Sequence, residues 1–294
     1  MIEIAGRKIG FGYPPIISAE LSISHNGNLD TALQMIDEAA KCGADACKLQ
    51  YYVTEDFAKP VTPSVHDVGG IDGEMITYVQ LAKGKDQTLG HVQPGYKEIT
   101  EPIYDLFKRN EISLEFVVAC QKRAKEHDLI FHCTTTSVQG VKEMAEIGVD
   151  CFKISSDMVE NIPMITEMYK HKDNIPLIIS TGHISPDLIP VFQEHRMLIF
   201  LHCVSEYPAK NPKLWKIKHM QELRYNYVET GVRYYPASIG YSHHSQGISD
   251  AVRATELGAV WIETHFVLDH TQPGPDAHWS LDPTELKQLA EAIK

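Results

Sequence analysis

The feature that most constrains this chain is a regular alternation of short apolar runs with longer amphipathic stretches. Eight runs of four to six residues are rich in Ile, Leu, Phe, Ala and Cys, as expected for strands buried on both faces. The runs are Ile16–Leu21, Ala46–Tyr51, Ile130–Thr134, Cys151–Ile154, Leu177–Ser180, Leu198–Cys203, Ala237–Tyr241 and Trp261–His265. Between the first two, Asp30–Cys42 repeats apolar residues at helical spacing. The alternation predicts strand–helix units around a parallel sheet.

Residues at the ends of these stretches agree with this prediction. Gly43, Gly148 and Gly258 follow amphipathic stretches and predict helix ends. Ser185-Pro186 and Asp282-Pro283 predict helix starts, because a capping side chain precedes a proline at the first helical position. Eight strands favour a (β/α)8 TIM barrel over the alternative, a doubly wound open sheet. We expect this barrel to occupy residues 1–294 as a single domain.

One connection is far longer than the others. About sixty residues, Thr54–Ile112, separate the second run from the helical pattern that begins near Ser113, whereas strand-to-helix loops usually have about 2–6 residues. We expect this insertion after the second strand to be a folded excursion over the top of the barrel.

The composition narrows the range of partners. The chain has 27 Lys and Arg against 39 Asp and Glu, and a formal net charge of −12 disfavours nucleic acid as a partner. No apolar run approaches the ~18 residues of a membrane span, and residues 1–7 do not resemble a secretion signal. Six cysteines without a CxxC pair are typical of reduced thiols. We therefore expect a cytoplasmic protein.

Polar side chains gather where the apolar runs end, which in a TIM barrel is where active sites lie. In chain order they are Glu20, Lys48, Gln50, Thr134, Lys153, Ser155, Ser156, Ser180, Thr181, His202, Ser242, His244, Glu263 and His265. Lys48 and Lys153 lie within strand residues and need anionic partners. With the hydroxyls they predict a phosphate or carboxylate site. Pairing with barrel carboxylates and a Schiff-base lysine are the alternatives.

Two histidines and two acidic residues add further chemistry. His244 and His265 end neighbouring strands and can share a divalent metal ion, although two hydrogen-bonded histidines are the alternative in a chain with 15. Glu20 suits either a general base or a salt-bridge partner for a lysine. Asp276, in the loop Pro273-Gly274-Pro275-Asp276, is expected either over the site or in a simple turn.

The sequence resembles the sialic acid (nonulosonic acid) synthase family over essentially its whole length. Nine motifs carry the resemblance: Ala19–Gly27, Gly43–Gln50, Phe152–Ser156, Ile179–Gly182, Leu201–Cys203, Tyr207-Pro208, Ile239–His244, Glu263–Phe266 and Pro273–Asp276. The resemblance implies a (β/α)8 barrel that condenses phosphoenolpyruvate with an open-chain amino-hexose aldehyde such as N-acetylmannosamine. A 2-keto-3-deoxy sugar acid and phosphate would be released. Mn2+ or Mg2+ is the implied cofactor, and we expect a homo-oligomer, most simply a dimer.

The resemblance also implies roles for the matching residues. The implied phosphoenolpyruvate contacts are Lys48, Thr134, Lys153, Ser156, Ser180 and Ser242. Glu20 is the implied catalytic glutamate, and Lys48 and Lys153 are expected to offset the charge of phosphoenolpyruvate. The implied metal ligands are His244 and His265. Residues that match positions facing the acceptor sugar are Gln50, Tyr207 and Asp276.

Five departures from the family pattern point to a changed acceptor. Ser24 and Ser205 replace Asn, Met158 an acidic residue, His243 an Asp, and Thr264 a basic residue. The family's C-terminal antifreeze-like domain, which lends an Arg to the sugar site of the other protomer, has no counterpart in this sequence. We therefore expect the condensation chemistry with an acceptor other than N-acetylmannosamine. A Schiff-base aldolase or lyase and a non-catalytic sugar-phosphate sensor are the alternatives.

Overall fold

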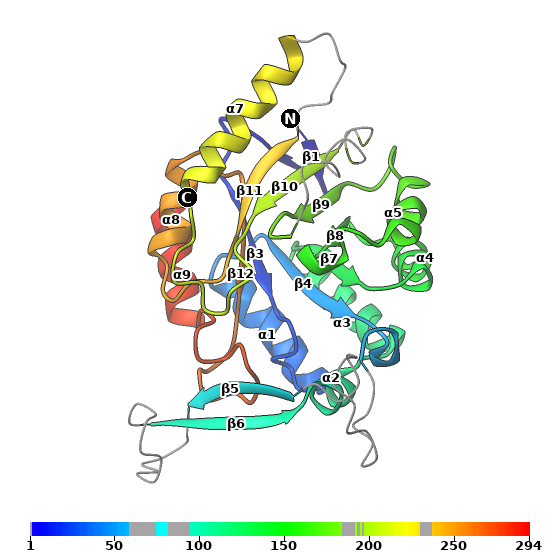
Figure 1. The fold of residues 1–294 in the computed structure, drawn as a ribbon, viewed down its shortest axis with the longest axis vertical. Helices are drawn as coiled ribbons and strands as arrows, with labels where there is room; N and C mark the ends of the chain where they lie inside the picture. Colours follow the sequence, from blue (N-terminus) through cyan, green and yellow to red (C-terminus); the bar gives the residue numbers. More distant parts are fainter. Residues whose placement is uncertain are drawn as a thin grey trace.

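Eight parallel strands close into a barrel in the computed structural model (Figure 1). The structure describes residues 2–58, 75–81, 95–183, 192, 195, 197–229 and 237–294, and only the backbone of 223–229. The barrel strands are β3 (Ile16–Glu20), β4 (Ala46–Tyr51), β7 (Ile130–Thr135), β8 (Cys151–Ile154), β9 (Leu177–Ser180), β10 (Leu198–His202), β11 (Ser238–His243) and β12 (Trp261–His265). Neighbours in this order pair with one another, and β12 pairs with β3. The predicted TIM barrel is confirmed, and the open sheet is excluded.

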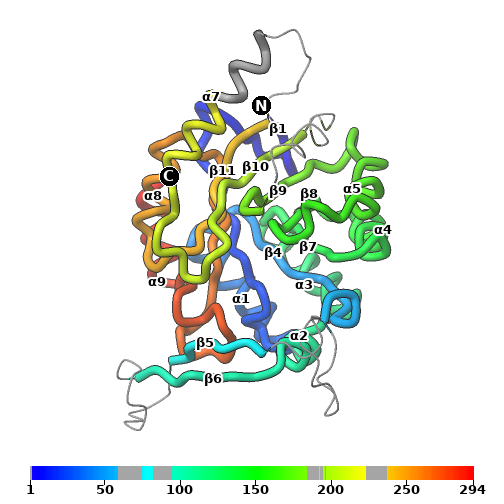
Figure 2. The backbone as a smooth tube through the Cα atoms, in the orientation of Figure 1, coloured from blue at the N-terminus to red at the C-terminus, as the bar shows by residue number. Residues whose placement is uncertain are grey.

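Helices flank the barrel (Figure 2). They are α1 (Leu29–Lys41), α3 (Leu114–Glu126), α4 (Val138–Ile147), α5 (Ile162–Tyr169), α7 (Trp215–Glu229), α8 (Ser249–Glu256) and α9 (Pro283–Ile293). The glycines predicted to end helices, Gly43, Gly148 and Gly258, have φ angles of +93°, +70° and +93°, which disfavour residues with a Cβ. Asp282 caps α9 as predicted, whereas Ser185-Pro186 lies outside the described residues. None of the described helices has the length and apolar character needed to cross a bilayer.

The barrel interior is packed at the amino ends of its strands. There β1 (Ile2–Ile4) and β2 (Arg7–Ile9) form an antiparallel hairpin. Ile4 and Ile9 are buried against the first residues of several strands, such as Ile130 and Trp261. A larger core lies between the strands and the helices. All six cysteines are buried free thiols, as predicted.

The insertion contributes a hairpin and a helix at the carboxyl end of the barrel. β5 (Met75–Leu81) and β6 (Tyr96–Pro102) pair as antiparallel strands, and α2 (Ile103–Asn110) follows directly. A short 3-10 helix, η1 (Thr54–Asp56), is tied to the end of the insertion, because Glu111 accepts hydrogen bonds from the N–H and hydroxyl of Thr54. Figure 1 shows the hairpin at the end of the molecule opposite to the N-terminus. The expected folded excursion is confirmed for the described part of 54–112.

Candidate active site

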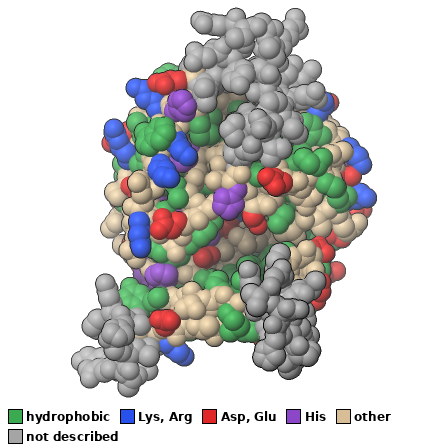
Figure 3. Space-filling view, viewed as in Figure 1, with side chains coloured by type: hydrophobic (Ala, Val, Ile, Leu, Met, Phe, Trp, Pro, Cys, Tyr) green, Lys and Arg blue, Asp and Glu red, His purple; other side chains and the backbone are tan. Residues whose placement is uncertain are grey.

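A cavity of about 790 Å³ opens at the carboxyl ends of the barrel strands, beside the β5–β6 hairpin. Figure 3 shows the surface hollowed next to this hairpin. Every residue that the sequence singled out for catalysis, substrate or metal lines the cavity: Glu20, Lys48, Gln50, Thr134, Lys153, Ser156, Ser180, Tyr207, Ser242, His244, His265 and Asp276. Residues that are up to 256 positions apart in the chain are therefore brought together as the strand-end argument predicts.

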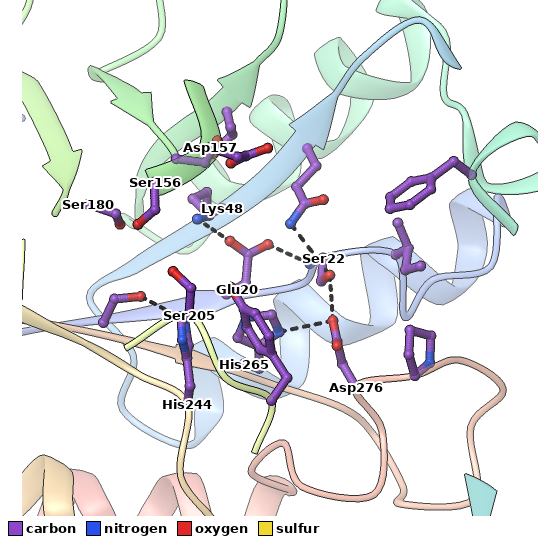
Figure 4. Close-up of a pocket in the computed structure, with 18 of the residues that line it drawn as sticks. Glu20, Ser22, Lys48, Ser156, Asp157, Ser180, Ser205, His244, His265 and Asp276 are labelled. Atoms are coloured by element: carbon purple, nitrogen blue, oxygen red, sulfur yellow. Dashed lines mark hydrogen bonds and ion pairs between the residues drawn. The ribbon is translucent and has the colours of Figure 1, made fainter. Parts of the chain in front are cut away.

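The bottom of the cavity carries two lysines and two glutamates in mutual contact. Lys48 Nζ lies 2.9 Å from Glu263 Oε1 and also pairs with Glu20, as Figure 4 shows for the latter. Lys153 Nζ lies 3.5 Å from Glu263 Oε1 and donates a hydrogen bond of 2.8 Å to Ser180 Oγ. These five residues are between 1% and 4% exposed. We call them the charged floor.

Strand geometry explains why these side chains meet. Neighbouring parallel strands place Glu20 beside Lys48 and His265 beside Glu20. Because side chains alternate between the two faces of a strand, Glu263 faces the cavity together with His265. The sequence analysis places Glu263 at a strand end but assigns it no function. Its spacing of two residues from His265 is the signal in the sequence that identifies it.

Burial and charge act against each other on the floor. Burial lowers the pKa of Lys48 to about 8, because desolvation penalises the ammonium more than Glu263 stabilises it. Burial alone would raise the pKa of Glu263, but Lys153 and Lys48 outweigh it and hold this pKa well below its usual range. The lysines thus pair with barrel carboxylates in this structure. An anion that enters the cavity would compete with Glu20 and Glu263 for them.

Hydroxyl groups near the floor lack partners. The Oγ1 of Thr134 and the Oγ of Ser205 are buried and have no hydrogen-bond partner in the part of the chain that the structure describes. The Oγ of Ser156 accepts a hydrogen bond of 3.0 Å from the Gly182 N–H. Because a buried hydroxyl without a partner is costly, the hydroxyls of Thr134 and Ser205 are available for hydrogen bonds to a polar ligand or to water in the cavity.

His244 and His265 lie next to each other, with ring centroids 5.7 Å apart. The Nδ1 of His244 lies 2.8 Å from the carbonyl oxygen of Val204, which can only accept, so this nitrogen carries the proton. The Nε2 is then unprotonated, and it lies 3.1 Å from Ser242 Oγ. Burial lowers the pKa of His244 to about 3, so the ring is neutral at pH 7. The ring of Tyr207 covers it at a centroid distance of 4.4 Å.

The donor set fits a divalent metal ion. Neutral imidazole nitrogens are common ligands of such ions, and a neighbouring carboxylate often orients them. Asp276 Oδ2 lies 3.2 Å from His265 Nδ1. Among the described residues, no third His, Cys, Asp or Glu forms with His244 and His265 a group whose ligand atoms all lie within 4.8 Å of one another. An ion held by this pair would take its remaining ligands from water and substrate.

A hydrogen-bond chain joins Asp276 to Glu20. Ser22 Oγ donates to Asp276 Oδ2 at 2.8 Å, and the Ser22 N–H donates to Glu20 Oε1 at 2.6 Å (Figure 4). Gln50 Nε2 donates a long hydrogen bond of 3.5 Å to Ser22 Oγ. Burial alone would raise the pKa of Asp276, but His265 and Ser22 hold it below its usual range. Asp276 therefore lies over the site and not in a simple turn. Ser22 is a site residue that sequence analysis missed.

The departures from the family pattern fall into two groups. Met158 and Ser205 line the cavity, as expected of residues that select the acceptor. His243 and Thr264 do not line it, because strand alternation turns them to the outer face, where their side chains meet at 3.0 Å. These two residues therefore adjoin the metal-ligand candidates His244 and His265 in the chain but do not face the pocket. Ser24 is also buried outside the cavity lining.

Two strand-end residues likewise turn away from the cavity. His202 Nε2 lies 2.7 Å from the carbonyl oxygen of Pro212, and Thr181 Oγ1 donates to the carbonyl oxygen of Leu201 at 3.0 Å. Neither His202 nor Thr181 lines the cavity. Their polar groups form hydrogen bonds to backbone carbonyl oxygens instead.

The insertion builds a side of the cavity that sequence analysis did not describe. Six apolar residues form a cluster separate from the two barrel cores, and all six line the cavity. They are Ile23, Tyr52, Phe57, Ile76, Leu106 and Phe107. We call this cluster the apolar wall. Only Ile23 lies within one of the nine motifs, and the cluster as a whole has no sequence signature, because its members come from four separate segments of the chain.

Comparisons with known proteins agree with this arrangement. The sequence profile of the NeuB family matches residues 77–294. The N-acetylneuraminate-9-phosphate synthase of Mus musculus is 30% identical over 98% of this chain and 72% of its own. The N,N'-diacetyllegionaminic acid synthase of Legionella pneumophila is 27% identical over 95% of this chain and 71% of its own. The sialic acid synthetase of Leptospira borgpetersenii, solved with citrate, matches with a TM-score of 0.75 and 28% identity over 99% of this chain and 87% of its own. As its motifs predict, this chain belongs to the NeuB family.

Proposed function

We propose that the protein condenses phosphoenolpyruvate with a sugar aldehyde and releases phosphate and a 2-keto-3-deoxy sugar acid. The observation that carries the proposal is the charged floor beside a pair of histidines in one cavity. Membership of the NeuB family supports it, since relatives are named as synthases of N-acetylneuraminate 9-phosphate and of diacetyllegionaminic acid.

The charged floor is the proposed binding site for phosphoenolpyruvate. The substrate has a phosphate and a carboxylate, and Lys48 and Lys153 offer it two buried cations. The unpaired hydroxyl of Thr134 supplies a further donor. Binding moves the lysines from Glu20 and Glu263 to the substrate, and this frees the Glu20 carboxylate for chemistry.

The reaction makes one C–C bond and breaks one C–O bond. C3 of phosphoenolpyruvate attacks the aldehyde carbon, and the aldehyde oxygen takes up a proton to become a hydroxyl. Water adds at C2, the bond from C2 to the phosphate oxygen breaks, and C2 becomes the keto carbon. Glu20, buried and held by the Ser22 N–H, accepts the proton that this water loses.

His244 and His265 are the proposed ligands of a divalent metal cofactor, Mn2+ or Mg2+. When bound, such an ion polarises the aldehyde carbonyl as a Lewis acid. The chain's own contribution is orientation. The Val204 carbonyl fixes the tautomer of His244, and Asp276 lies against His265.

The acceptor is proposed to differ from N-acetylmannosamine. Met158 and Ser205 line the cavity at positions where the family pattern has an acidic residue and an Asn. A site that loses hydrogen-bonding groups loses its preference for the substrate groups that they bound.

The homodimer and the cytoplasmic location stay predictions.

The test is phosphate release from phosphoenolpyruvate with Mn2+ across a panel of aldoses, followed by mass spectrometry of the products. We expect phosphate release that requires the aldose, and a product whose mass is that of the aldose plus one pyruvate unit. Phosphoenolpyruvate with 18O in the bridging position should pass this label to phosphate. Absence of phosphate release with every aldose contradicts the proposal.

A Schiff-base aldolase is the second candidate, because the lowered pKa of Lys48, about 8, increases its share of free amine. Borohydride reduction in the presence of pyruvate discriminates the two candidates. The condensation mechanism predicts no covalent adduct, whereas an aldolase would be trapped as a reduced adduct on a lysine of the floor.

A further inference from the structure

Trp279 packs against both histidines of the proposed metal site. The centroid of its ring lies 4.6 Å from that of His265 and 6.1 Å from that of His244. The Tyr207 ring lies 5.6 Å from the Trp279 ring and also contacts both histidines. All six pairs among these four rings are within the usual range of aromatic contacts. We call these four residues the ring cluster.

The apolar cores do not account for the burial of Trp279. It is 3% exposed, yet it belongs to none of the three apolar clusters found among the described residues. Trp279 does not line the main cavity, so it has no direct contact with a substrate bound there. It does line a second cavity, of about 200 Å³. Trp279 therefore has the two histidines on one side and this second cavity on another.

A tight turn brings Trp279 and Asp276 to the same histidine. The Trp279 N–H donates to the carbonyl oxygen of Asp276 at 3.2 Å. The N–H and the hydroxyl of Ser280 donate to the same oxygen at 3.0 and 2.7 Å. From this turn the Asp276 carboxylate reaches a ring nitrogen of His265 (Figure 4), and the Trp279 indole packs against the ring. One short segment thus supplies both contacts.

The two histidines differ in how their rings are held. His244 is held through both nitrogens, by a backbone carbonyl at 2.8 Å and by Ser242 Oγ at 3.1 Å. His265 Nδ1 lies 3.2 Å from Asp276 Oδ2, but it forms no aligned hydrogen bond with any described residue. Because the torsion next to an imidazole ring has broad minima, this contact alone does not fix the plane of the His265 ring. The packing of Trp279 supplies the missing constraint.

We propose that Trp279 is a positioning residue of the metal site, whose indole holds the His265 ring, and with Tyr207 the His244 ring, oriented to bind one divalent ion. The inference rests on the proposed function, which assigns the ion to these histidines. Groups that orient metal ligands typically change metal affinity about 10- to 100-fold without touching the ion. A smaller side chain at position 279 would also open the histidines toward the second cavity.

The first test is the affinity for Mn2+, measured by isothermal titration calorimetry. Trp279→Leu removes the aromatic ring and should weaken Mn2+ binding about tenfold. Trp279→Phe keeps a ring that packs on His265 and should stay within about threefold of the parent protein. Trp215→Leu is the matched control, because Trp215 is 63% exposed on α7 and lines neither cavity. It should leave the affinity within about twofold.

Two spectroscopic measurements distinguish positioning from a general loss of structure. The electron paramagnetic resonance spectrum of bound Mn2+ reports the geometry of its ligands. At saturating Mn2+ this spectrum should change in Trp279→Leu and stay unchanged in Trp215→Leu. Mn2+ also quenches the fluorescence of a nearby indole, and Trp279 is one of three tryptophans. Quenching by Mn2+ should therefore be largely lost in Trp279→Phe and kept in Trp215→Leu, with Mg2+ as the control ion that is not paramagnetic.

The outcomes separate this inference from the proposed function. If Trp279→Leu keeps the affinity and the resonance spectrum of the parent protein, or if Trp279→Phe binds as weakly as Trp279→Leu, the inference is wrong although the two histidines stand as ligands. If neither His244→Ala nor His265→Ala weakens Mn2+ binding, the proposed metal site is wrong and the inference falls with it. If the variants bind Mn2+ as expected and no aldose gives phosphate release, the condensation is wrong and the inference stands.

Discussion

The charged floor and the apolar wall face the same cavity, yet the chain builds them in different ways. The residues of the floor belong to strands of a closed barrel, and the backbone pairing of these strands places Glu20 beside Lys48. The wall is assembled from four segments and depends on the packing of side chains such as Phe57 and Phe107. A substitution in the wall can therefore change the shape of the cavity without disturbing the floor. Under the proposed function, this difference would allow the acceptor preference to change while the phosphoenolpyruvate chemistry is kept.

The largest effect is expected on the floor, from Lys153→Ala. The change removes a cation from phosphoenolpyruvate and leaves Ser180 without its donor, so kcat/KM for phosphoenolpyruvate should fall about 100-fold or more. Initial rates at a fixed acceptor concentration measure it, and circular dichroism checks the fold. Lys108→Ala is the control, since that side chain is 43% exposed and pairs with Glu55 and Glu111 outside the cavity. A folded Lys153→Ala protein with an unchanged rate contradicts the role of the floor.

The histidines at the edge of the floor should dominate metal binding. His265→Ala removes one of two proposed ligands and should weaken Mn2+ binding at least about tenfold, as measured by isothermal titration calorimetry. The matched control is His270→Ala, because His270 forms a different group with Asp282 and Glu285 at the start of α9. If His270→Ala loses Mn2+ binding and His265→Ala does not, the metal site lies at the start of α9 and not at His244 and His265. Chelation of the metal should leave the barrel folded, since apolar packing between strands and helices forms its core.

The pH dependence gives a further test of the floor. The free protein holds the pKa of Lys48 at about 8, so its ammonium is lost as the pH rises through this value. Since kcat/KM reports the free enzyme, its value for phosphoenolpyruvate should fall about tenfold per pH unit above pH 8. Lys48→Arg, whose guanidinium stays charged, should flatten this alkaline limb. An unaltered kcat/KM up to pH 10 in the parent protein would show that Lys48 does not bind the anion as a cation.

The smallest effect is expected from a single hydroxyl beside the wall. Tyr78→Phe removes the hydrogen bond to Glu101 that holds the hairpin strand in place, and KM for the acceptor should rise about two- to fivefold. Tyr104→Phe is the matched control, because its hydroxyl bonds to Glu55 on the exposed side of the insertion. Equal KM values for parent and Tyr78→Phe would indicate that the hairpin position does not depend on this bond.

The floor could be predicted from sequence because it follows from strand positions alone. The bounds of β4, β8, β9 and β12 match the predicted runs, so Lys48, Lys153 and Ser180 lie at the strand ends where the sequence places them. The alternation of side chains between the two faces of a strand also puts Glu263 on the same side as His265. By the same rule, His243 and Thr264 face away from the pocket.

The wall and Ser22 could not be predicted in this way. The wall depends on contacts between the insertion and the barrel, and apolar residues such as Ile76 carry no distinguishing pattern within a strand. Ser22 reaches Asp276 only because the chain turns sharply after β3, where Ser22 has a φ of +48°. Such a conformation is uncommon for residues other than glycine, and no residue pattern announces it here.

The central claim is that the floor binds phosphoenolpyruvate and the wall binds the acceptor. It is tested most directly by measuring both KM values in Ser180→Ala and in Phe57→Ala. Ser180→Ala should raise KM for phosphoenolpyruvate about three- to tenfold and leave KM for the acceptor within about twofold. Phe57→Ala should do the reverse, with a rise of about tenfold for the acceptor. Two variants that raise both KM values equally would contradict the division of the cavity into these two halves.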